Sequence, residues 1–496
     1  MAEAASIGRP QIAWRVLLVF AALKLVLHAA TNWQYGFHRD ELYYINGGMH
    51  LGWGYVDHPP LTPLLARLAT AIFGLSVPGL RLFAALAGVG IVLLAGLLAR
   101  EFGAERLGQA LAALAVLLAP LYLVTNTMFQ TVPFDQFWWL LIAYLLVRLI
   151  NGGDARLWLL IGLVGGIALE TKYTVALLGL GLAVGLVATP LRAQLWSRWF
   201  WLGLALAALI AAPNLAWQIQ NGFPTLEFIR NNSADVRNDS SRLGLVAEML
   251  ILAGPPLLPL LTAGFVFFWS RAHRQYRVFG WASVVVLVVV IGGQAKAYYA
   301  GPLFALLFAG GAAQLEPWLL RRSAALRADI VGALTVLSLP VFVALLPILP
   351  PALFISSGVY QTNDEYTEML GWPDLVDAVT ATFERLPVNE QANTAILTGN
   401  YGEASAIELL APRLPAPISG HNSHYYWSIG RTDAPTYIVL GYSAQRLRVW
   451  FDDVQQAGVI SNRYRAPNEE FDQPFFICRR PKVQLSTIWP TIKHFN

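Results

Sequence analysis

An acidic and aromatic segment follows the first long apolar stretch of the chain. Between Phe37 and Tyr44 the sequence places two adjacent carboxylates, Asp40 and Glu41, and a pair of tyrosines that begins at Tyr43. Carboxylates at a membrane boundary are costly to desolvate, so they are rare there and usually functional. This pair could abstract a proton, hold a metal ion or fix a polar headgroup. A solvated interfacial loop is the alternative.

The same loop continues to a rigid turn in which Asp57 and His58 precede two prolines. The residues after Asp40 favour a short helix that starts from an aspartate cap and ends at a glycine pair. Such a helix would hold its two tyrosines at the level of the lipid headgroups. A second amphipathic helix is expected over 61–73. Because connectors are usually short, a loop of this length is more typical of a functional element.

The composition places the chain in a membrane. Of its 496 residues 56% are hydrophobic and 13% are charged, and the mean hydropathy is +0.51. Soluble domains carry about 25% charged residues, so a polytopic membrane protein is predicted. The net charge of +4 comes from arginines scattered between apolar stretches, which does not indicate nucleic-acid binding. The single cysteine, Cys478, excludes an intramolecular disulfide and a cysteine-rich metal site.

Apolar windows of near-bilayer length recur through the first two thirds of the chain. They predict about eleven transmembrane helices. The windows are 12–31, 79–99, 107–125, 134–150, 157–171, 173–190, 199–217, 244–270, 277–294, 298–316 and 329–350. The first window lacks a convincing small-residue cleavage site, so it is expected to remain as an anchor.

From residue 351 onward the composition becomes that of a soluble domain. The predicted elements are strands at 394–398, 436–440 and 475–478 and a helix at 402–410. Alternating strands and helices indicate a small α/β domain. The predicted fold class is therefore mainly α, with a polytopic membrane domain over 1–350 and a soluble α/β domain over 351–496.

Basic residues divide the connections between the windows into two groups. By the positive-inside rule the arginine-bearing group is cytoplasmic. It contains Arg9, Arg15, Arg100, Arg106, Arg148, Arg156, Arg192, Arg198, Arg271, Arg274, Arg277, Arg321, Arg322 and Arg327. An odd number of spans then places 351–496 on the outer side, together with the connections 32–78, 126–133, 170–172, 218–243 and 294–298. We therefore expect a protein of the inner (plasma) membrane whose candidate residues face the periplasm or the cell exterior.

Further candidate residues lie on this outer side. Lys172 and Lys296 oppose the charge rule, and an ammonium there can neutralise a lipid phosphate beside a tyrosine hydroxyl. Snorkelling to the interface is the alternative for each lysine. Asp135 is either functional or a cap of the helix that follows Pro133. Arg230 is a further phosphate candidate, with a solvated loop arginine as the alternative.

Taken together, these motifs resemble the GT-C glycosyltransferases of family 39, which include the protein O-mannosyltransferases and the lipid A aminoarabinose transferases. The likeness is carried by the acidic pair with its two tyrosines, Gly54-Tyr55, Asp57-His58-Pro59-Pro60-Leu61, Asp135, Lys172-Tyr173-Thr174, Pro213-Asn214 with Trp217, and Lys296 with Tyr298-Tyr299. Two C-terminal segments, 399–404 and 419–423, resemble the outer domain of bacterial members.

The resemblance implies a GT-C fold and inverting transfer of a sugar from a polyprenyl-phosphate carrier of the undecaprenyl-phosphate type. The acceptor is a hydroxyl or phosphate of a lipid, glycan or protein on the outer face. Asp40 would be the general base, because proton removal must accompany attack on the anomeric carbon. Glu41 and Asp135 would orient the acceptor or a metal ion.

The resemblance also assigns the remaining candidates. The groups that would bind the donor phosphate, where negative charge develops, are Lys172, Lys296, Tyr298, Tyr299 and Arg230. The groups at the acceptor and in the loop would be Tyr43, Tyr44, Asp57 and His58. A divalent metal stays open, with Asp40, Glu41, Asp135, His38 and His58 as candidate ligands.

Two other classes of function stay open. A transporter or flippase of lipid-linked sugars would show ionisable residues along a path through the membrane and helices broken in paired halves. A non-catalytic membrane scaffold would use the outer domain to bind a partner. The gathering of ionisable residues at one face, with no half-repeat in the sequence, favours the enzyme.

Overall fold

The chain divides into two compact units, which we describe separately. A computed structural model describes residues 10–239 and 241–496, and Arg9 lies outside them. The helical unit contains Met1–Thr31, Arg81–Ala216 and Ser233–Leu346, and the mixed unit contains Asn32–Leu80, Trp217–Asn232 and Pro347–Asn496. The predicted domains 1–350 and 351–496 separate a membrane part from a soluble part and stay a prediction. By compactness, the first loop belongs with the C-terminal part of the chain.

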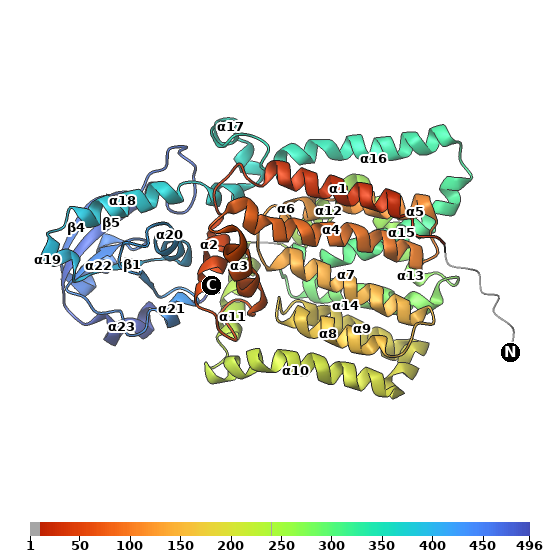
Figure 1. Cartoon of the computed structure of the whole chain (residues 1–496), viewed down its shortest axis with the longest axis horizontal. Coiled ribbons are helices and arrows are strands. Elements are labelled where there is room, and N and C mark those ends of the chain that lie inside the picture. The colour runs from red at the N-terminus through yellow and green to blue at the C-terminus, as the bar shows by residue number, and fades with distance from the viewer. Residues whose placement is uncertain (1–9, 240) are drawn as a thin grey trace. The chain divides into compact units, whose positions relative to one another are not determined.

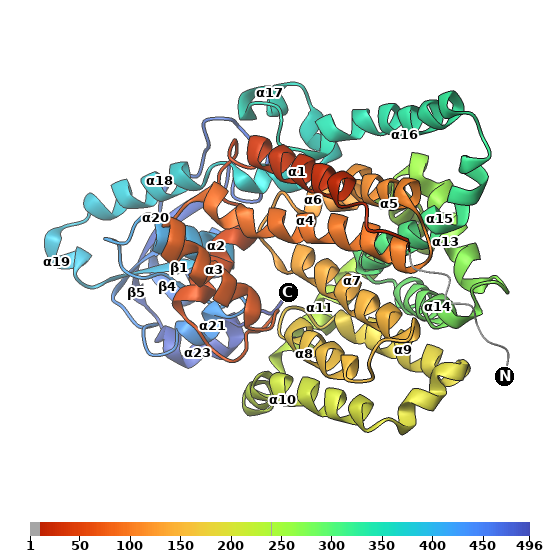
Figure 2. The ribbon, with the colours of Figure 1, turned by 45° about the vertical axis from the view of Figure 1, so that its right-hand side comes forward.

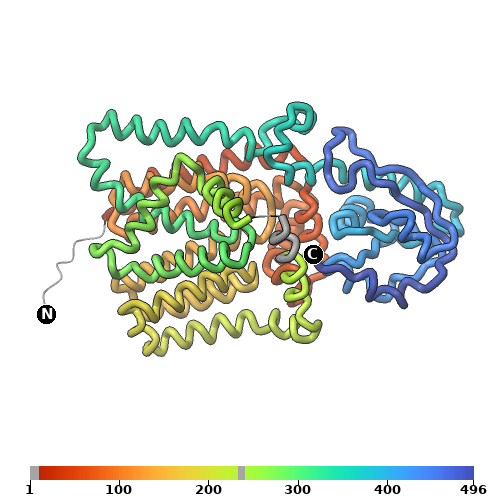
Figure 3. The backbone as a smooth tube through the Cα atoms, turned by 180° about the vertical axis from the view of Figure 1, so that it is seen from behind, coloured from red at the N-terminus to blue at the C-terminus, as the bar shows by residue number. Residues whose placement is uncertain are grey.

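The helical unit is a bundle of apolar helices that run side by side, as the ribbon and the tube both show (Figures 1 and 3). Its helices are α1 (Trp14–Thr31), α4 (Val77–Glu101), α5 (Arg106–Leu118), α6 (Pro120–Thr125), α7 (Thr131–Ile150), α8 (Leu157–Leu169), α9 (Val175–Ala188), α10 (Arg198–Gln220), α12 (Arg242–Ala253), α13 (Leu258–Trp269), α14 (Arg277–Gly292), α15 (Pro302–Leu320) and α16 (Ala324–Leu345). Short 3-10 turns, η1 (Pro190–Trp196), η2 (Pro255–Leu257) and η4 (Ala297–Ala300), join some of them.

Fewer of these helices than predicted are long enough to cross a bilayer. Within the described residues, 7 helices pass by length and composition, or up to 9 if each bent pair forms one span. Every predicted window lies on apolar helix, but 107–125 and 157–171 meet α5 and α8, which have 13 residues each. Thirteen residues rise about 20 Å, less than the roughly 30 Å of a hydrocarbon core. The count of about eleven spans therefore stays a prediction.

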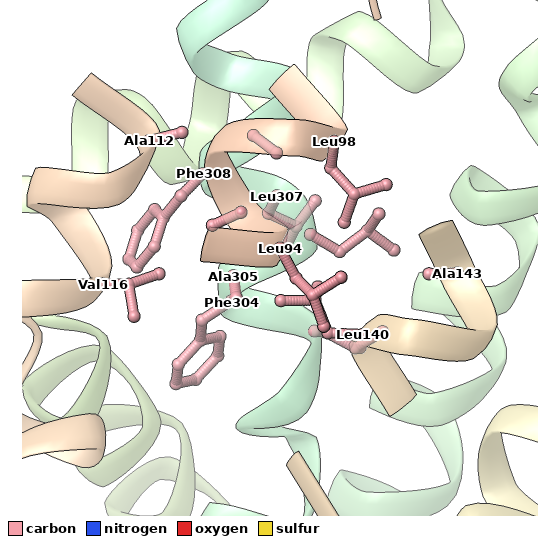
Figure 4. Packing of buried hydrophobic residues seen from close by; sticks show 14 of the residues in the cluster. Leu94, Leu98, Ala112, Val116, Leu140, Ala143, Phe304, Ala305, Leu307 and Phe308 are labelled. Atoms are coloured by element: carbon pink, nitrogen blue, oxygen red, sulfur yellow. The ribbon is translucent and has the colours of Figure 1, made fainter. Parts of the chain in front are cut away.

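The core of the helical unit forms where α4, α5, α7, α13 and α15 pack together. Figure 4 shows leucine, phenylalanine and small side chains of this core meeting between helices. Glycines bring two of the backbones into contact: a Cβ built on Gly264 of α13 would lie 1.9 Å from the carbonyl oxygen of Leu307, and one on Gly311 of α15 would lie 1.9 Å from that of Leu260. Such small residues let helices approach closely in membranes.

The mixed unit combines the first loop with a small sheet. The loop forms α2 (Arg39–Met49) and α3 (Leu61–Phe73), and the second of these has the predicted bounds. The remaining helices are α11 (Pro224–Asp239), of which 224–232 lie in this unit, α17 (Pro351–Ser356), α18 (Trp372–Glu384), α19 (Val388–Gln391), α20 (Tyr401–Leu410), α21 (His424–Trp427), α22 (Ala444–Trp450) and α23 (Leu485–Ile492). Figure 2 shows α2 and α3, and the strands with α18 and α20 beside them.

The sheet has five strands in the order β2-β1-β3-β5-β4. The predicted strands are present as β1 (Thr394–Thr398), β3 (Thr436–Val439) and β5 (Pro474–Pro481), and the predicted helix is α20. Two strands were not predicted. Strand β2 (Ile418–Ser419) has only two residues, and β4 (Phe451–Val459) is a partly exposed edge strand without a clean apolar alternation.

The parallel part of the sheet has a topological switch. Strand β1 pairs in parallel with β2 on one side and with β3 on the other. The chain leaves β1 through α20 to β2 and then crosses to β3. In parallel sheets, functional loops gather beyond the carboxyl ends of the strands at such a switch. Gly399 and Gly441 mark this point, because a Cβ on Gly399 would lie 2.7 Å from the Cα of Gly441.

Candidate active site

The first turn of α2 presents the acidic pair, and its two carboxylates have different surroundings. The predicted aspartate cap is wrong, because the capping residue is His38, whose Nδ1 accepts a hydrogen bond from the backbone N–H of Asp40 at 3.1 Å. The Glu41 carboxylate is buried and accepts from the backbone N–H of His38 at 2.9 Å. The pair of interactions forms a capping box. Glu41 therefore holds the helix start, while Asp40 remains half-buried beside it.

Asp40 is contacted by a residue from the far end of the chain. The hydroxyl of Tyr401 donates to Oδ1 of Asp40 at 2.7 Å, across 361 residues of sequence. Tyr401 is the first residue of α20, directly after the capping residue Asn400. Burial, followed by the charge of Asp40, raises the pKa of the Tyr401 hydroxyl well above its usual value. Tyr401 is therefore a neutral hydrogen-bond donor to the carboxylate at neutral pH.

Arg39 supplies positive charge next to Asp40. Its guanidinium lies 2.6 Å from Glu469, 3.5 Å from Glu470 and 3.6 Å from Glu368, measured between side-chain nitrogen and oxygen atoms. It also lies over the ring of Tyr401, 5.4 Å from the centroid. Burial raises the pKa of Glu470 to about 7, although Arg39 opposes this shift. Arg39 therefore joins the start of α2 to an acidic cluster of the C-terminal part.

The tyrosines of α2 are inside the protein, which corrects the prediction that they lie at headgroup level. Tyr43 is 1% exposed and Tyr44 is 7% exposed. The Tyr43 hydroxyl donates to Asp57 at 2.8 Å and accepts from the backbone N–H of Ser423 at 3.1 Å. The Tyr43 hydroxyl thus has protein hydrogen-bond partners where the prediction expected lipid headgroups.

The turn that contains Asp57 and His58 packs against these tyrosines. His58 is buried, with its ring 4.9 Å from that of Tyr44 and 5.5 Å from that of Tyr43. Burial raises the pKa of Asp57, although the neighbouring His58 opposes this. The structure thus brings Tyr43 and Tyr44 of α2 into one cluster with Asp57 and His58.

In the helical unit, Asp135 lies near the start of α7 and is fully engaged by protein donors. Trp139 donates to Oδ1 at 3.0 Å and Thr174 donates to Oδ2 at 2.7 Å. The residue is 3% exposed. Its carboxylate thereby ties the first turn of α7 to the turn that precedes α9.

Lys172 and the two tyrosines of η4 form a cationic group in the same unit. The Lys172 ammonium lies 5.3 Å from the ring centroid of Tyr298 and 5.6 Å from that of Tyr299. It donates to the hydroxyl of Thr131, at the first residue of α7, at 3.0 Å. The N-terminal end of a helix and an ammonium both favour an anion. These groups together can hold a phosphate.

The other predicted phosphate ligands are less organised. Lys296 directly precedes η4 and is half-buried, and it makes no hydrogen bond or ion pair with the described residues. Arg230 is exposed on α11, and no hydrogen bond or ion pair of the described residues links it to another candidate. Lys24 of α1 is fully buried and donates to the carbonyl oxygen of Tyr122 at 2.6 Å.

The candidate metal ligands His38, Asp40, Glu41 and His58 lie in the mixed unit, and Asp135 lies in the helical unit. Among residues 10–239 and 241–496, no group of three or more His, Cys, Asp or Glu side chains is placed to hold a metal ion. His38 and Glu41 are occupied in the capping box instead.

Tyr401 and Arg39 are the residues that sequence reasoning missed. A local signal did exist, because Asn400 and Glu403 form a second capping box directly after β1 and so mark a helix start at the carboxyl end of a parallel strand. The pairing of that helix start with the start of α2 has no local signal.

Comparisons with known proteins give a family match and several fold matches. Residues 57–217 match the family model described as dolichyl-phosphate-mannose-protein mannosyltransferase. The matched region includes Asp57, Asp135 and Lys172, and it begins after Asp40. Among curated proteins, no sequence matches the chain.

The structure resembles solved glycosyltransferases at low sequence identity. ArnT from Cupriavidus metallidurans bound to undecaprenyl phosphate matches with a TM-score of 0.59 and 15% identity, covering 96% of this chain and 98% of that chain. The Archaeoglobus fulgidus oligosaccharyltransferase tethered with an acceptor peptide matches with a TM-score of 0.51 and 14% identity, covering 82% of this chain and 64% of that chain. AglB from the same organism, in complex with an inhibitory peptide and a dolichol-phosphate, matches with a TM-score of 0.50 and 14% identity, covering 86% and 69%. These matches confirm the predicted resemblance and the GT-C fold.

Proposed function

We propose that this chain, a multi-span membrane protein with the GT-C glycosyltransferase fold, transfers a sugar from a polyprenyl-phosphate donor to an acceptor hydroxyl or phosphate. The donor lipid is of the undecaprenyl-phosphate type, and the acceptor is a lipid, glycan or protein. The reaction takes place on the outer face of the inner (plasma) membrane, where the soluble C-terminal domain also lies. ArnT, whose fold covers nearly the whole chain, was solved bound to undecaprenyl phosphate, which supports the choice of donor.

The proposal depends mainly on the burial and the hydrogen-bond partner of the Asp40 carboxylate. Its carboxylate is half-buried at a helix start, and it is held by one tyrosine hydroxyl on Oδ1. In a single displacement, Asp40 accepts the acceptor proton while the acceptor oxygen bonds to the anomeric carbon. The bond between that carbon and the lipid phosphate oxygen breaks, so the sugar configuration inverts. Glu41 supports this base by holding the first turn of α2.

On the donor side, positive charge must balance the leaving phosphate. Lys172 is held by Thr131 and by the rings of Tyr298 and Tyr299, so the ammonium is preorganised for an anion. Lys296 adds a second ammonium, and Arg230 adds a guanidinium at the outer loop. Asp135 keeps the turn that carries Lys172 in place through Thr174.

The experiment is a transfer assay with purified protein in lipid nanodiscs. Radiolabelled polyprenyl-phosphate sugars are supplied with membrane acceptors, and wild type is compared with Asp40→Asn. We expect Asp40→Asn to reduce kcat by about 100-fold or more, since general base catalysis contributes roughly 10² to 10⁴. A matched control tests specificity. Asp374→Asn changes a surface carboxylate paired with Arg463 at 2.8 Å. This variant should retain transfer.

The same assay tests the donor side. Lys172→Met should lower kcat by about 100-fold, the typical effect of removing one donor at a developing negative charge. Lys482→Met, at a partly exposed lysine of the C-terminal part, should not. Full transfer by Asp40→Asn would remove Asp40 as the base. Binding of donors without transfer, across many sugars and acceptors, would favour a scaffold, and movement of intact donor across a vesicle membrane would favour a flippase.

A further inference from the structure

The geometry points to Tyr401 as a positioning residue for Asp40, contributed by the C-terminal part of the chain. Its hydroxyl fixes the orientation of the Asp40 carboxylate. The inference rests on the proposed function in taking Asp40 as the base. It adds that the residues after β1, and not the first loop alone, determine how that base works.

The backbone at Tyr401 is fixed by its own capping box. The side chain of Asn400 accepts from the backbone N–H of Glu403 at 2.8 Å. The Glu403 carboxylate accepts from the backbone N–H groups of Gly399 at 2.8 Å and Asn400 at 3.2 Å. Because α20 starts directly after β1, the sheet sets the position of Tyr401 at the carboxyl edge of its parallel strands.

The ring of Tyr401 is held from several sides. Its centroid lies 4.8 Å from that of Tyr43 and 4.8 Å from that of His421. The Arg39 guanidinium lies 5.4 Å from the same centroid. An aromatic ring held in this way has little rotational freedom, so its hydroxyl has a defined direction. That direction is toward Oδ1 of Asp40.

The bond leaves one carboxylate oxygen for the reaction. Among the described residues, no other side chain donates a hydrogen bond to Asp40. Oδ2 can therefore receive the acceptor proton while Oδ1 is held. A base held in one orientation loses rate when its support is removed, while binding of the donor is unaffected. A fall in kcat without a change in donor KM therefore separates a positioning role from simple packing.

The test variant is Tyr401→Phe, which keeps the ring and removes the hydroxyl. The matched control is Tyr442→Phe, because Tyr442 lies just after β3 and its buried hydroxyl has no hydrogen-bond partner among the described residues. Transfer is measured in nanodiscs, with kcat and the donor KM determined separately. We expect Tyr401→Phe to lower kcat about tenfold, because the base is then less well oriented. Donor KM should stay unchanged, and Tyr442→Phe should match wild type.

Thermal unfolding provides a readout that does not require activity. Asp40→Asn, Tyr401→Phe and the double variant form a cycle, and a direct interaction predicts that the two shifts in Tm are not additive. Additive shifts would show that the hydroxyl does not interact with Asp40 and would overturn the inference. An unchanged kcat in Tyr401→Phe would also overturn it, while leaving Asp40 as the base. Full activity of Asp40→Asn would instead overturn the proposed base.

Discussion

Asp40 and Glu41 are neighbours in sequence with the same chemistry, and the structure separates their roles. Glu41 points back along α2 and caps its first turn, which the helix dipole also favours. Asp40 instead accepts a hydrogen bond from the hydroxyl of Tyr401. A single helical position, about 100° of rotation, separates the buried carboxylate that caps the helix from the half-buried one that Tyr401 contacts.

At the residue scale, His421 predicts how stability depends on pH. Burial, and next the charge of His494, lower the pKa of His421 to about 3 from the model-peptide value of 6.5. Between these values the folded ring stays neutral while the unfolded ring binds a proton. The contribution of His421 to stability is therefore complete above pH 6.5 and is lost as pH falls toward 3. One proton corresponds to at most about 1.4 kcal/mol per pH unit.

Replacing this ring should flatten the acid dependence. Denaturant unfolding of the purified protein at about pH 7.5 and about pH 5 gives the change in the free energy of unfolding. We expect the free energy of unfolding to fall less for His421→Asn than for wild type between the two pH values. The measurement at the higher pH gives the stability that the variant loses through missing contacts alone. An equal loss in both proteins would show that another group titrates in this range.

At the element scale, the approach of α13 and α15 depends on the absence of side chains. Backbone atoms face each other at Gly264 and Gly311, where even a methyl group has no room. Apolar side chains gain little by leaving lipid for the helix interface, so close backbone packing has to supply the stability of this pair. The core shown in Figure 4 is built around the same helix, α15.

A pair of glycine variants tests this packing. Gly311→Ala places a Cβ 1.9 Å from the carbonyl oxygen of Leu260 and should force the two helices apart, at a cost of about 3 kcal/mol. Gly332→Ala, in α16, meets no atom within 4 Å and should be neutral or stabilising by up to about 1 kcal/mol. Thermal unfolding in detergent compares the two. Similar shifts in Tm for both variants would contradict the close contact.

At the scale of the whole molecule, the predicted topology can be measured with introduced cysteines. The native Cys478 is fully buried, and Cys478→Ser provides an unlabelled background. Gly52→Cys and Arg322→Cys each place a thiol at an exposed position. A membrane-impermeant maleimide applied to intact cells should label the first, in the outer loop, and should label the second only after permeabilisation. Labelling of both, or of Arg322→Cys alone, would overturn the assignment of the two sides.

The sequence predicted the elements better than it predicted their partners. The helix at 61–73 and the strand at 394–398 were recovered with their observed bounds, because hydrophobic periodicity and helix caps are local signals. The two tyrosines of α2 were predicted to lie at the level of the lipid headgroups. Nothing in the loop sequence indicates that the Tyr43 hydroxyl contacts Asp57 and Ser423 instead. The edge strand β4 was missed because its exposed faces carry no alternation.

By itself, the sequence determined a polytopic, mainly helical membrane protein, the acidic loop and the resemblance to the GT-C glycosyltransferases. These follow from hydropathy windows, charge distribution and short motifs, all of which act over a few residues. Only the tertiary structure decided that Glu41 caps α2 and that Lys172 lies over Tyr298 and Tyr299. It also decided that the Tyr401 hydroxyl donates to Asp40. Contacts across hundreds of residues depend on how whole elements pack, and no local pattern encodes which helix start will meet another.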